Sequence, residues 1–232
     1  MNRRVINGEM ILDISEIEET VKKGQERSIL LGFYDYTVIL TYVGMLFAFM
    51  GILLSINENF KGAVICLMTA GFCDMFDGTI ASTKKRTKNQ KRFGIQIDSL
   101  SDLISFGILP AVFVYMFSGK NTLSAIVTAI YTLFALIRLS FFNVMEEERQ
   151  DSTSGKRKEY LGVPVTTVSL LLPLVYILYI TNLLSNTIFL LHALLLLGHL
   201  FIIAVRIVKP QKTGKIIMLL FGIIEAVGVF ML

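Results

Sequence analysis

Long stretches without charged side chains dominate this sequence and limit the folds that are open to it. Uncharged, mostly apolar runs cover residues 36–56, 103–117, 161–185 and 187–205. A helix needs roughly 20 such residues to cross the hydrocarbon core of a bilayer. Only 17% of the residues are charged and the mean hydropathy is +0.66, whereas a soluble domain carries about 25% charged residues. The sequence therefore predicts an all-α, polytopic integral membrane protein.

The chain is expected to divide into a polar N-terminal segment, 1–32, and one transmembrane domain, 33–232. In the N-terminal segment, Ile14, Ile17 and Val21 are spaced to form the apolar stripe of a short amphipathic helix. The segment has no apolar core of the kind that marks a signal peptide. In the second part, the apolar runs predict membrane spans near 34–57, 61–82, 98–118, 121–145, 162–183, 186–208 and 214–232.

Small residues in the first two spans suggest close helix packing. Gly44 and Gly51 leave room for another helix to approach the first span. Cys66 and Cys73 lie in one apolar segment, with neither a Cys-x-x-Cys pair nor a neighbouring His. We therefore interpret the two cysteines as small buried side chains and not as a metal or redox site.

The distribution of basic residues predicts the orientation in the membrane. If the N-terminus is cytoplasmic, nearly all of the 22 Lys and Arg residues lie on the cytoplasmic side. Lys61 and Lys120 are the two in outside loops, and Arg138 lies inside a span. Because cytoplasmic loops are enriched in Lys and Arg, the loop between the second and third spans should be cytoplasmic.

Four aspartates flank this basic loop. Asp74 and Asp77 are three residues apart at the end of the second span, and so share a helix face. Asp98 and Asp102 are four residues apart at the start of the third predicted span. Four converging carboxylates repel one another unless cations or protons neutralise them. Oxygen-only ligands suit Mg²⁺, Mn²⁺ or Ca²⁺, and Mg²⁺ typically keeps positions open for substrate phosphates.

A structural role is the alternative for these residues. Interfacial aspartates can cap helices or pair with nearby lysines, but two closely spaced pairs beside apolar helices favour a functional site. Gly78 and Ala81 follow Asp77 and would let a ligand approach the backbone, or would simply allow helix packing. The basic run 84–92 anchors the loop at the membrane surface and can also attract an anionic substrate.

The pattern around the aspartates resembles the signature of the CDP-alcohol phosphatidyltransferase family. The matching positions are Asp74, Asp77, Gly78, Ala81, Gly94, Asp98 and Asp102, in the family's order. There are two departures: Ser82 stands where the family has Arg, and the spacer before Gly94 is longer. We expect Lys84, Lys85 or Arg86 to supply the missing positive charge.

The resemblance implies a six-helix core with a cavity that faces the cytoplasm, and a homodimer; the last apolar run adds an extra C-terminal transmembrane helix to that core. The resemblance assigns Asp74, Asp77, Asp98 and Asp102 to Mg²⁺ or Mn²⁺, with Asp102 also the general base. It also places Asp74, Asp77, Gly78, Ala81 and Gly94 around the CDP-lipid. The acceptor alcohol then attacks the β-phosphorus and CMP leaves. We expect membrane lipids, and no nucleic acid, as further partners.

Two further stretches resemble the bacterial and archaeal branch that makes phosphatidylserine from CDP-diacylglycerol and L-serine. They are 98–111 and 138–143, the latter followed by Leu-Gly-Val-Pro-Val at 161–165. In these stretches the candidates for binding the acceptor or a phosphate are Ser99, Ser105 and Arg138. Snorkelling of Arg138 to the interface, and helix-to-helix hydrogen bonds for the serines, are the structural alternatives.

Other functions remain open from the sequence. The same chemistry with glycerol phosphate or an inositol phosphate as acceptor is the nearest alternative. A divalent-cation transporter would spread acidic residues through the depth of the membrane, whereas here they cluster at one depth on two consecutive helices. A non-catalytic relative that binds CDP-lipid is suggested by Ser82. The expected location is a prokaryotic cell membrane, with the N-terminus and the active site facing the cytoplasm.

Overall fold

The computed structural model describes residues 5–6, 9–10, 32–152, 159–184, 186, 188–208 and 212–231. Contacts divide the chain into two units, Met1–Phe33 and Tyr34–Leu232. In the first unit, strands β1 (Val5–Ile6) and β2 (Glu9–Met10) pair antiparallel. The predicted amphipathic helix around 14–21 lies outside the described residues.

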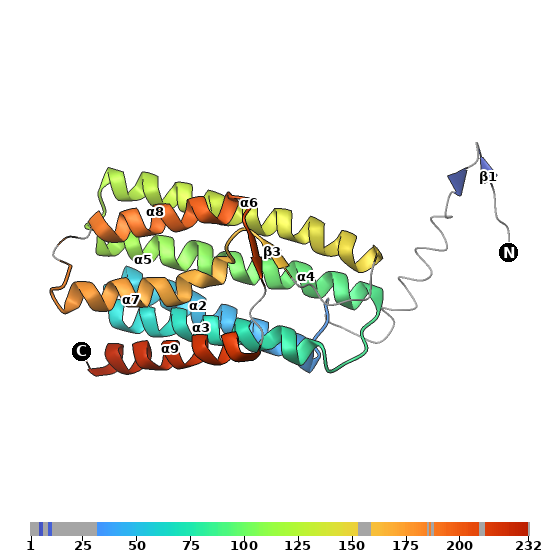
Figure 1. The fold of residues 1–232 in the computed structure, drawn as a ribbon, viewed down its shortest axis with the longest axis horizontal. Coiled ribbons are helices and arrows are strands. Elements are labelled where there is room, and N and C mark those ends of the chain that lie inside the picture. The colour runs from blue at the N-terminus through green and yellow to red at the C-terminus, as the bar shows by residue number, and fades with distance from the viewer. Residues whose placement is uncertain are drawn as a thin grey trace. The chain divides into compact units, whose positions relative to one another are not determined.

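The second unit is a bundle of helices, shown in Figure 1. Its first half contains α2 (Tyr36–Ile56), α3 (Phe60–Ala81), α4 (Lys88–Asp102), the π-helix η1 (Leu103–Ile108) and α5 (Leu109–Phe117). Its second half contains α6 (Thr122–Ser152), the 3₁₀ helix η2 (Val165–Thr167), α7 (Val168–Ile180), α8 (Ile188–Ile202) and α9 (Lys212–Met231). The short strands β3 (Glu159–Leu161) and β4 (Arg206–Val208) pair antiparallel between the helices.

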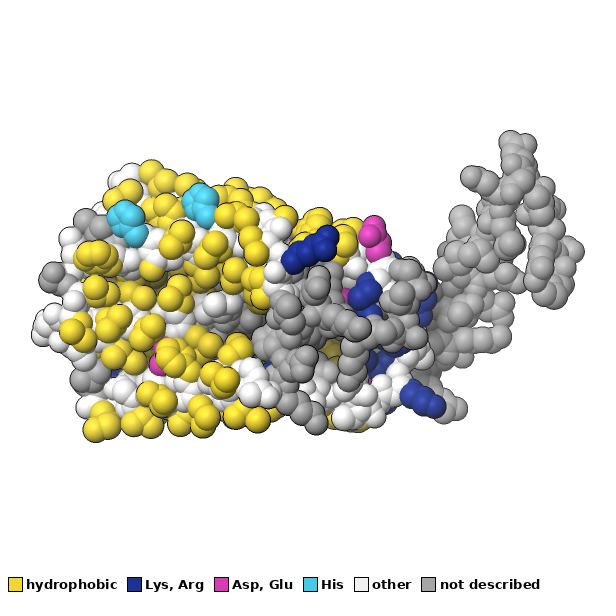
Figure 2. All heavy atoms as spheres, viewed as in Figure 1, with side chains coloured by type: hydrophobic (Ala, Val, Ile, Leu, Met, Phe, Trp, Pro, Cys, Tyr) yellow, Lys and Arg dark blue, Asp and Glu magenta, His cyan; other side chains and the backbone are white. Residues whose placement is uncertain are grey.

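The prediction of an all-α polytopic membrane protein is confirmed. Among the described residues, five helical stretches are long and apolar enough to cross a membrane: Tyr36–Ile56, Phe60–Ala81, Lys88–Phe117, Thr122–Arg149 and Thr213–Met231. Two apolar stretches are shorter, Val165–Ile180 and His192–Ile202. Large apolar side chains remain exposed on α2, α6 and α9, and hydrophobic side chains cover much of the face in Figure 2. Such a surface suits a lipid environment.

The helix of the third predicted span begins earlier than the span itself. The span is predicted to start near residue 98, but α4 begins at Lys88, so Asp98 and Asp102 are preceded by further helical turns. Thr87 explains the early start, because its side chain accepts from the Gln90 N–H while the Gln90 side chain accepts from the Thr87 N–H. Such a capping box satisfies two backbone donors at a helix start.

The helical stretch that carries these aspartates is therefore longer than the membrane is thick. The 30 residues of Lys88–Phe117 span about 45 Å at 1.5 Å per residue, against about 30 Å of hydrocarbon. The additional turns belong to the polar start of α4. The sixth predicted span was also too long, because α8 ends at Ile202 and residues Arg206–Val208 form β4.

Close packing of α2 against α3 depends on the small residues noted in the sequence. A Cβ atom on Gly44 would lie 3.1 Å from the Cys73 Cβ, and one on Gly51 would lie 3.0 Å from the Cys66 Cβ. Both cysteines are buried and carry free thiols. The interpretation of the cysteines as small buried side chains is confirmed, and the glycines bring α2 close to the helix that carries Asp74.

The π-helix η1 directly follows Asp102, and its hydrogen bonding depends on a tyrosine. Pro110 lacks an N–H group, so the Phe106 carbonyl, four residues earlier, loses its ordinary helical donor. The Tyr131 hydroxyl of α6 donates to this carbonyl at 2.6 Å, and the Tyr131 side chain is fully buried. The Leu109 N–H donates to the Ile104 carbonyl, five residues earlier, which is the hydrogen-bond spacing of a π-helix. Within the bilayer such backbone groups must be satisfied by the protein itself.

Glu225 does not prevent the last span from forming. Helix α9 runs through it, and the Glu225 side chain is only 3% exposed. The helix thus turns this carboxyl group toward the protein, while neighbours such as Ile224 and Val227 remain exposed to the surroundings. Burial against the bundle keeps a polar group out of lipid, where it would be costly.

Replacing Tyr131 with phenylalanine should destabilise the bundle. The Phe106 carbonyl would lose its donor in a buried position, so we expect the free energy of unfolding to fall by about 1–3 kcal/mol. Thermal unfolding of the purified protein in detergent measures this. Tyr115→Phe is the matched control, because no hydrogen bond of the Tyr115 hydroxyl is found within the described part of the chain. Equal unfolding temperatures for the two variants would contradict the role given to Tyr131.

Candidate active site

The structure brings three of the four aspartates together. Asp74 and Asp77 come from the last turns of α3, and Asp98 comes from α4. One carboxylate oxygen from each residue lies within 4.8 Å of the other two, and all three side chains are partly buried. The Thr41 hydroxyl of α2 donates to the Asp77 carboxylate at 3.3 Å. Two consecutive helices, joined by a short loop, thus bring their carboxylates together, as the spacing of the aspartates predicts.

This group fits a hard divalent cation. The donors are all carboxylate oxygens, which Mg²⁺ and Mn²⁺ prefer, and their separation allows one ion to contact more than one of them. Because the carboxylates repel one another at this distance, a bound cation would also relieve the electrostatic cost of the arrangement. The metal assignment itself stays a prediction.

Asp102 lies one helical turn beyond Asp98 on α4, and its side chain lines the same cavity. It is outside the group of three carboxylates that lie within 4.8 Å of one another. A carboxylate one turn from the group can face a reacting hydroxyl while the other three hold the cation. The position of Asp102 therefore agrees with its predicted role as general base. It differs from that of the other three aspartates, whose carboxylates lie close together.

The four aspartates line a cavity of about 1110 Å³. The predicted CDP-lipid residues Gly78, Ala81 and Gly94 also line it. A Cβ atom on Gly78 would meet nothing within 4 Å, so this backbone faces open space beside Asp77. A ligand can therefore approach the α3 backbone closely at the point where the carboxylates meet.

The three basic candidates of the loop occupy different places. Arg86 lines the cavity, and a Cβ atom on Gly94 would lie 2.9 Å from its Nη1 atom, so the glycine leaves space for this guanidinium. Lys85 is exposed and is not among the cavity-lining residues. Ser82, which replaces the family Arg, lines the cavity and donates its hydroxyl to the Thr79 carbonyl at 2.7 Å, as part of the end of α3.

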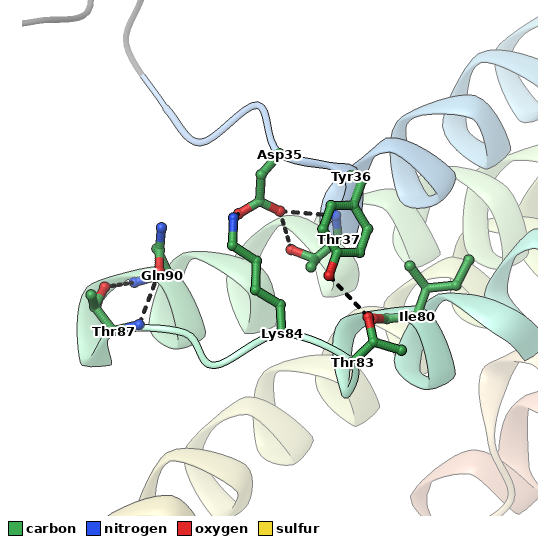
Figure 3. A network of polar contacts seen from close by, with 8 residues as sticks. All are labelled: Asp35, Tyr36, Thr37, Ile80, Thr83, Lys84, Thr87 and Gln90. Carbon is green, nitrogen blue, oxygen red and sulfur yellow. Dashed lines mark hydrogen bonds and ion pairs between the residues drawn. The ribbon is translucent and has the colours of Figure 1, made fainter.

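Lys84 instead joins the start of α2 to the loop after α3, as Figure 3 shows. Its Nζ atom lies 3.0 Å from the Asp35 Oδ2 atom. Asp35 caps α2 by accepting from the Thr37 N–H at 2.9 Å and from the Thr37 hydroxyl. The Tyr36 hydroxyl bonds to the Thr83 hydroxyl at 3.1 Å. These contacts give Lys84 a structural partner outside the cavity.

The predicted acceptor serines are buried between helices. Ser105 lies on η1 and is 2% exposed, and Ser99 donates to the Asn143 side chain of α6. Neither serine is among the residues that line the cavity. The Asn143 amide also donates to Gln96 at 3.3 Å, and Gln96 donates to Glu147 at 3.2 Å. These contacts join the polar ends of α4 and α6.

Arg138 lines the cavity from α6 and is buried, with its guanidinium over the Phe142 ring at 5.4 Å. Helix α6 continues to Ser152, beyond the predicted end of the span at residue 145. The added turns are polar, so they do not change the distance from Arg138 to the membrane surface. The burial of Arg138 in the cavity wall favours the predicted contact with a ligand over snorkelling.

Sequence reasoning assigns no role to Thr41 and Lys215, which line the cavity and form hydrogen bonds to α3. Thr41 orients Asp77, and Lys215 of α9 donates from its Nζ atom to the Met75 carbonyl at 3.0 Å. Lys215 looked like an ordinary loop cation in the sequence. One sequence feature could have identified it. Lys215 stands at the start of the last apolar run, so its charge is expected at the same depth in the membrane as the aspartates.

Comparison with known proteins identifies the class. The model of the CDP-alcohol phosphatidyltransferase family matches residues 37–205, which is more than half of the chain. The chain therefore belongs to this family. The match covers all four aspartates and ends before α9.

Curated relatives give the more specific likeness. A CDP-diacylglycerol–serine O-phosphatidyltransferase of Saccharomyces cerevisiae is 35% identical over 109 residues, 46% of this chain and 38% of the relative. One of Helicobacter pylori is 27% identical over 143 residues, 61% of this chain and 56% of the relative. An archaetidylserine synthase of Methanothermobacter thermautotrophicus is 31% identical over 130 residues, 56% of this chain and 52% of the relative. The matches thus span about half the length of these relatives, or less.

The capping role of Asp35 predicts a pH-dependent contribution to stability. The Thr37 hydroxyl, followed by Lys84, lowers the pKa of Asp35 from 3.8 to about 2. A carboxyl group with a lowered pKa stabilises the fold above about pH 4 and loses this effect as the pH falls toward 2. We expect Asp35→Ala to cost about 1 kcal/mol at pH 7, and the cost to shrink between pH 4 and pH 2. Thermal unfolding in detergent across this range measures it.

Asp35→Asn is the matched control. Asn caps a helix about as well as Asp does, and an exposed ion pair contributes little. This variant should therefore stay close to the wild type at pH 7. If Asp35→Ala were as stable as Asp35→Asn there, the capping role would be wrong.

Proposed function

We propose that this protein transfers the phosphatidyl group of CDP-diacylglycerol to the hydroxyl group of L-serine, which gives phosphatidylserine and CMP. The observation that carries the proposal is the convergence of Asp74, Asp77 and Asp98 at a cavity lined by the family signature. Family membership supports the transfer chemistry, and the names of the relatives support serine as acceptor. The cavity provides anionic ligands at one point and apolar walls beyond.

Asp74, Asp77 and Asp98 would hold Mg²⁺ or Mn²⁺ and so bind the diphosphate indirectly. When bound, the cation neutralises phosphate charge and stabilises the leaving group. The open space beside Gly78 admits the nucleotide part of the substrate to the α3 backbone. Arg86 adds a positive charge at the rim next to Gly94, where an anionic substrate would pass.

Asp102 is the proposed general base. Its carboxylate accepts the proton of the serine hydroxyl as the hydroxyl oxygen forms a bond to the β-phosphorus of CDP-diacylglycerol. The bond between that phosphorus and the bridging oxygen breaks, and CMP leaves with the electron pair. Asp102 suits this role because it lines the cavity one turn from the other three carboxylates. A positioned base of this kind contributes about 10²–10⁴-fold in rate.

The proposed setting is a prokaryotic cell membrane, with the N-terminus and the cavity mouth facing the cytoplasm. It is supported by the six basic residues between Lys84 and Arg92, which lie in the loop after α3 and in the first turns of α4, next to the aspartates. CDP-diacylglycerol would enter from the bilayer and serine from the cytoplasm. A homodimer is part of the same proposal and is expected from the family resemblance.

An assay of CMP release tests the proposed function. Purified protein in liposomes, supplied with CDP-diacylglycerol and Mn²⁺ or Mg²⁺, should release CMP with L-serine, and much less with glycerol phosphate or inositol phosphate. Asp102→Asn should lower kcat by about 10²–10⁴-fold, because an amide cannot accept the proton. Asp35→Asn, a change of the same kind outside the cavity, is the control and should leave kcat unchanged.

The outcomes separate the parts of the proposal. Release with glycerol phosphate but not with serine would overturn the acceptor. Full activity of Asp102→Asn would overturn the base, while leaving the transfer reaction intact. No release with any alcohol, from protein that unfolds at the normal temperature, would contradict the enzymatic function.

A further inference from the structure

The cavity of the aspartates continues into the bundle along α9, the helix that lies outside the family match. The α9 residues that line it beyond Lys215 are Met218, Leu219, Gly222, Ile223, Ala226 and Phe230. They recur every three or four residues and therefore form one face of the helix. From Lys215 to Phe230 this face is about 22 Å long at 1.5 Å per residue. That length exceeds half of a hydrocarbon core of about 30 Å.

Helix α3 forms the opposite side of this part of the cavity, and two lysines join the helices at their ends. Lys215 donates to the Met75 carbonyl at 3.0 Å near the aspartates, and Lys61 donates to the Phe230 carbonyl at 3.1 Å at the other end. The two helices are therefore antiparallel along the cavity. Between these ties, Gly222 and Ala226 present little side-chain volume to the space.

Lys215 places a positive charge at the polar end of this apolar passage. It lines the cavity together with Asp74, Asp77 and Asp98. An ammonium group has three donors, and the Met75 carbonyl accepts one of them. The Lys215 ammonium can therefore donate to an anionic ligand without losing its position on α3.

We propose that α9 binds the lipid part of the nucleotide-lipid substrate. Lys215 donates to the diphosphate, and the face from Met218 to Phe230 holds one acyl chain. This inference rests on the proposed function and names where its lipid substrate lies. The identity of the ligand is inferred from charge and polarity. A ligand for this cavity needs an anionic group near Lys215 and the cation that the carboxylates would bind, and a long apolar chain beside α9.

Binding of two substrates that differ in chain length tests the assignment of Lys215. CDP-dioctanoylglycerol and CDP-dipalmitoylglycerol are titrated onto purified protein in nanodiscs with Mn²⁺, and the Kd is measured by calorimetry. Lys215→Gln should raise the Kd for both substrates on the order of tenfold, because a charge-assisted hydrogen bond is lost. Lys61→Gln is the matched control, since it removes the same kind of tie between α3 and α9 far from the aspartates. It should leave both Kd values unchanged.

A change in the apolar face tests the acyl site. Ala226→Phe should raise the Kd for the dipalmitoyl substrate on the order of tenfold, because the larger side chain fills the passage. The dioctanoyl substrate should bind as before. Val227→Phe is the control, because its neighbouring position is 51% exposed on the outer side of α9. If Ala226→Phe unfolds at a lower temperature than wild type, Gly222→Val provides a second change in the same face.

The possible results distinguish this inference from the function on which it rests. If the wild type binds neither substrate, the proposed function fails. If the wild type binds both but Lys215→Gln behaves like Lys61→Gln, the phosphate contact is wrong. If the face variants weaken both substrates equally, or behave like Val227→Phe, the acyl site is wrong. If the wild type binds phosphatidylglycerol as tightly as CDP-dipalmitoylglycerol, the nucleotide-lipid assignment is wrong.

Discussion

Repulsion among carboxylates is the constraint around which this bundle is built. Three carboxylate oxygens from α3 and α4 lie within 4.8 Å of one another in a chain that is 54% hydrophobic. In a low-dielectric environment such charges are tolerated only with protons, cations or a polar opening. The cavity provides the opening, and Arg86 and Lys215 place positive charges in its wall. The apolar helices around it keep the four aspartates at one depth.

Packing at a distance from the aspartates holds them in place. Gly44 and Gly51 let α2 approach α3 so closely that the Thr41 hydroxyl reaches Asp77. On the other side, the polar contacts of Ser99 and Gln96 with α6 fix the rotation of α4. The apolar core and the polar site thus depend on the same helix surfaces. A change that loosens either one would move the carboxylates apart.

Local spacing predicted much of the site, and long-range contacts account for what it missed. The pairs at i,i+3 and i,i+4 predicted that the aspartates share helix faces, and apolar length predicted most of the spans. Span limits set by membrane thickness could not show that α4 begins at Lys88, because Thr87 provides its cap outside the apolar run. The sequence also could not place Lys215 beside Met75, 140 residues away. Lys84 likewise has its partner, Asp35, in a distant segment.

Helix α9 lies far along the chain from α3 and α4, which carry the aspartates. The carboxylates and the apolar surface of α9 therefore belong to separate segments of the sequence. The family match ends at residue 205 and α9 begins at Lys212, so the part of the apolar wall that α9 forms lies outside the matched region, whereas the carboxylates lie inside it. The names of the relatives agree on serine but differ in the lipid. Substitutions in one terminal helix can alter the wall and leave α3 and α4 untouched. If α9 holds the acyl chain as proposed, substitutions there would adapt the protein to a different lipid while the carboxylates of α3 and α4 stay unchanged.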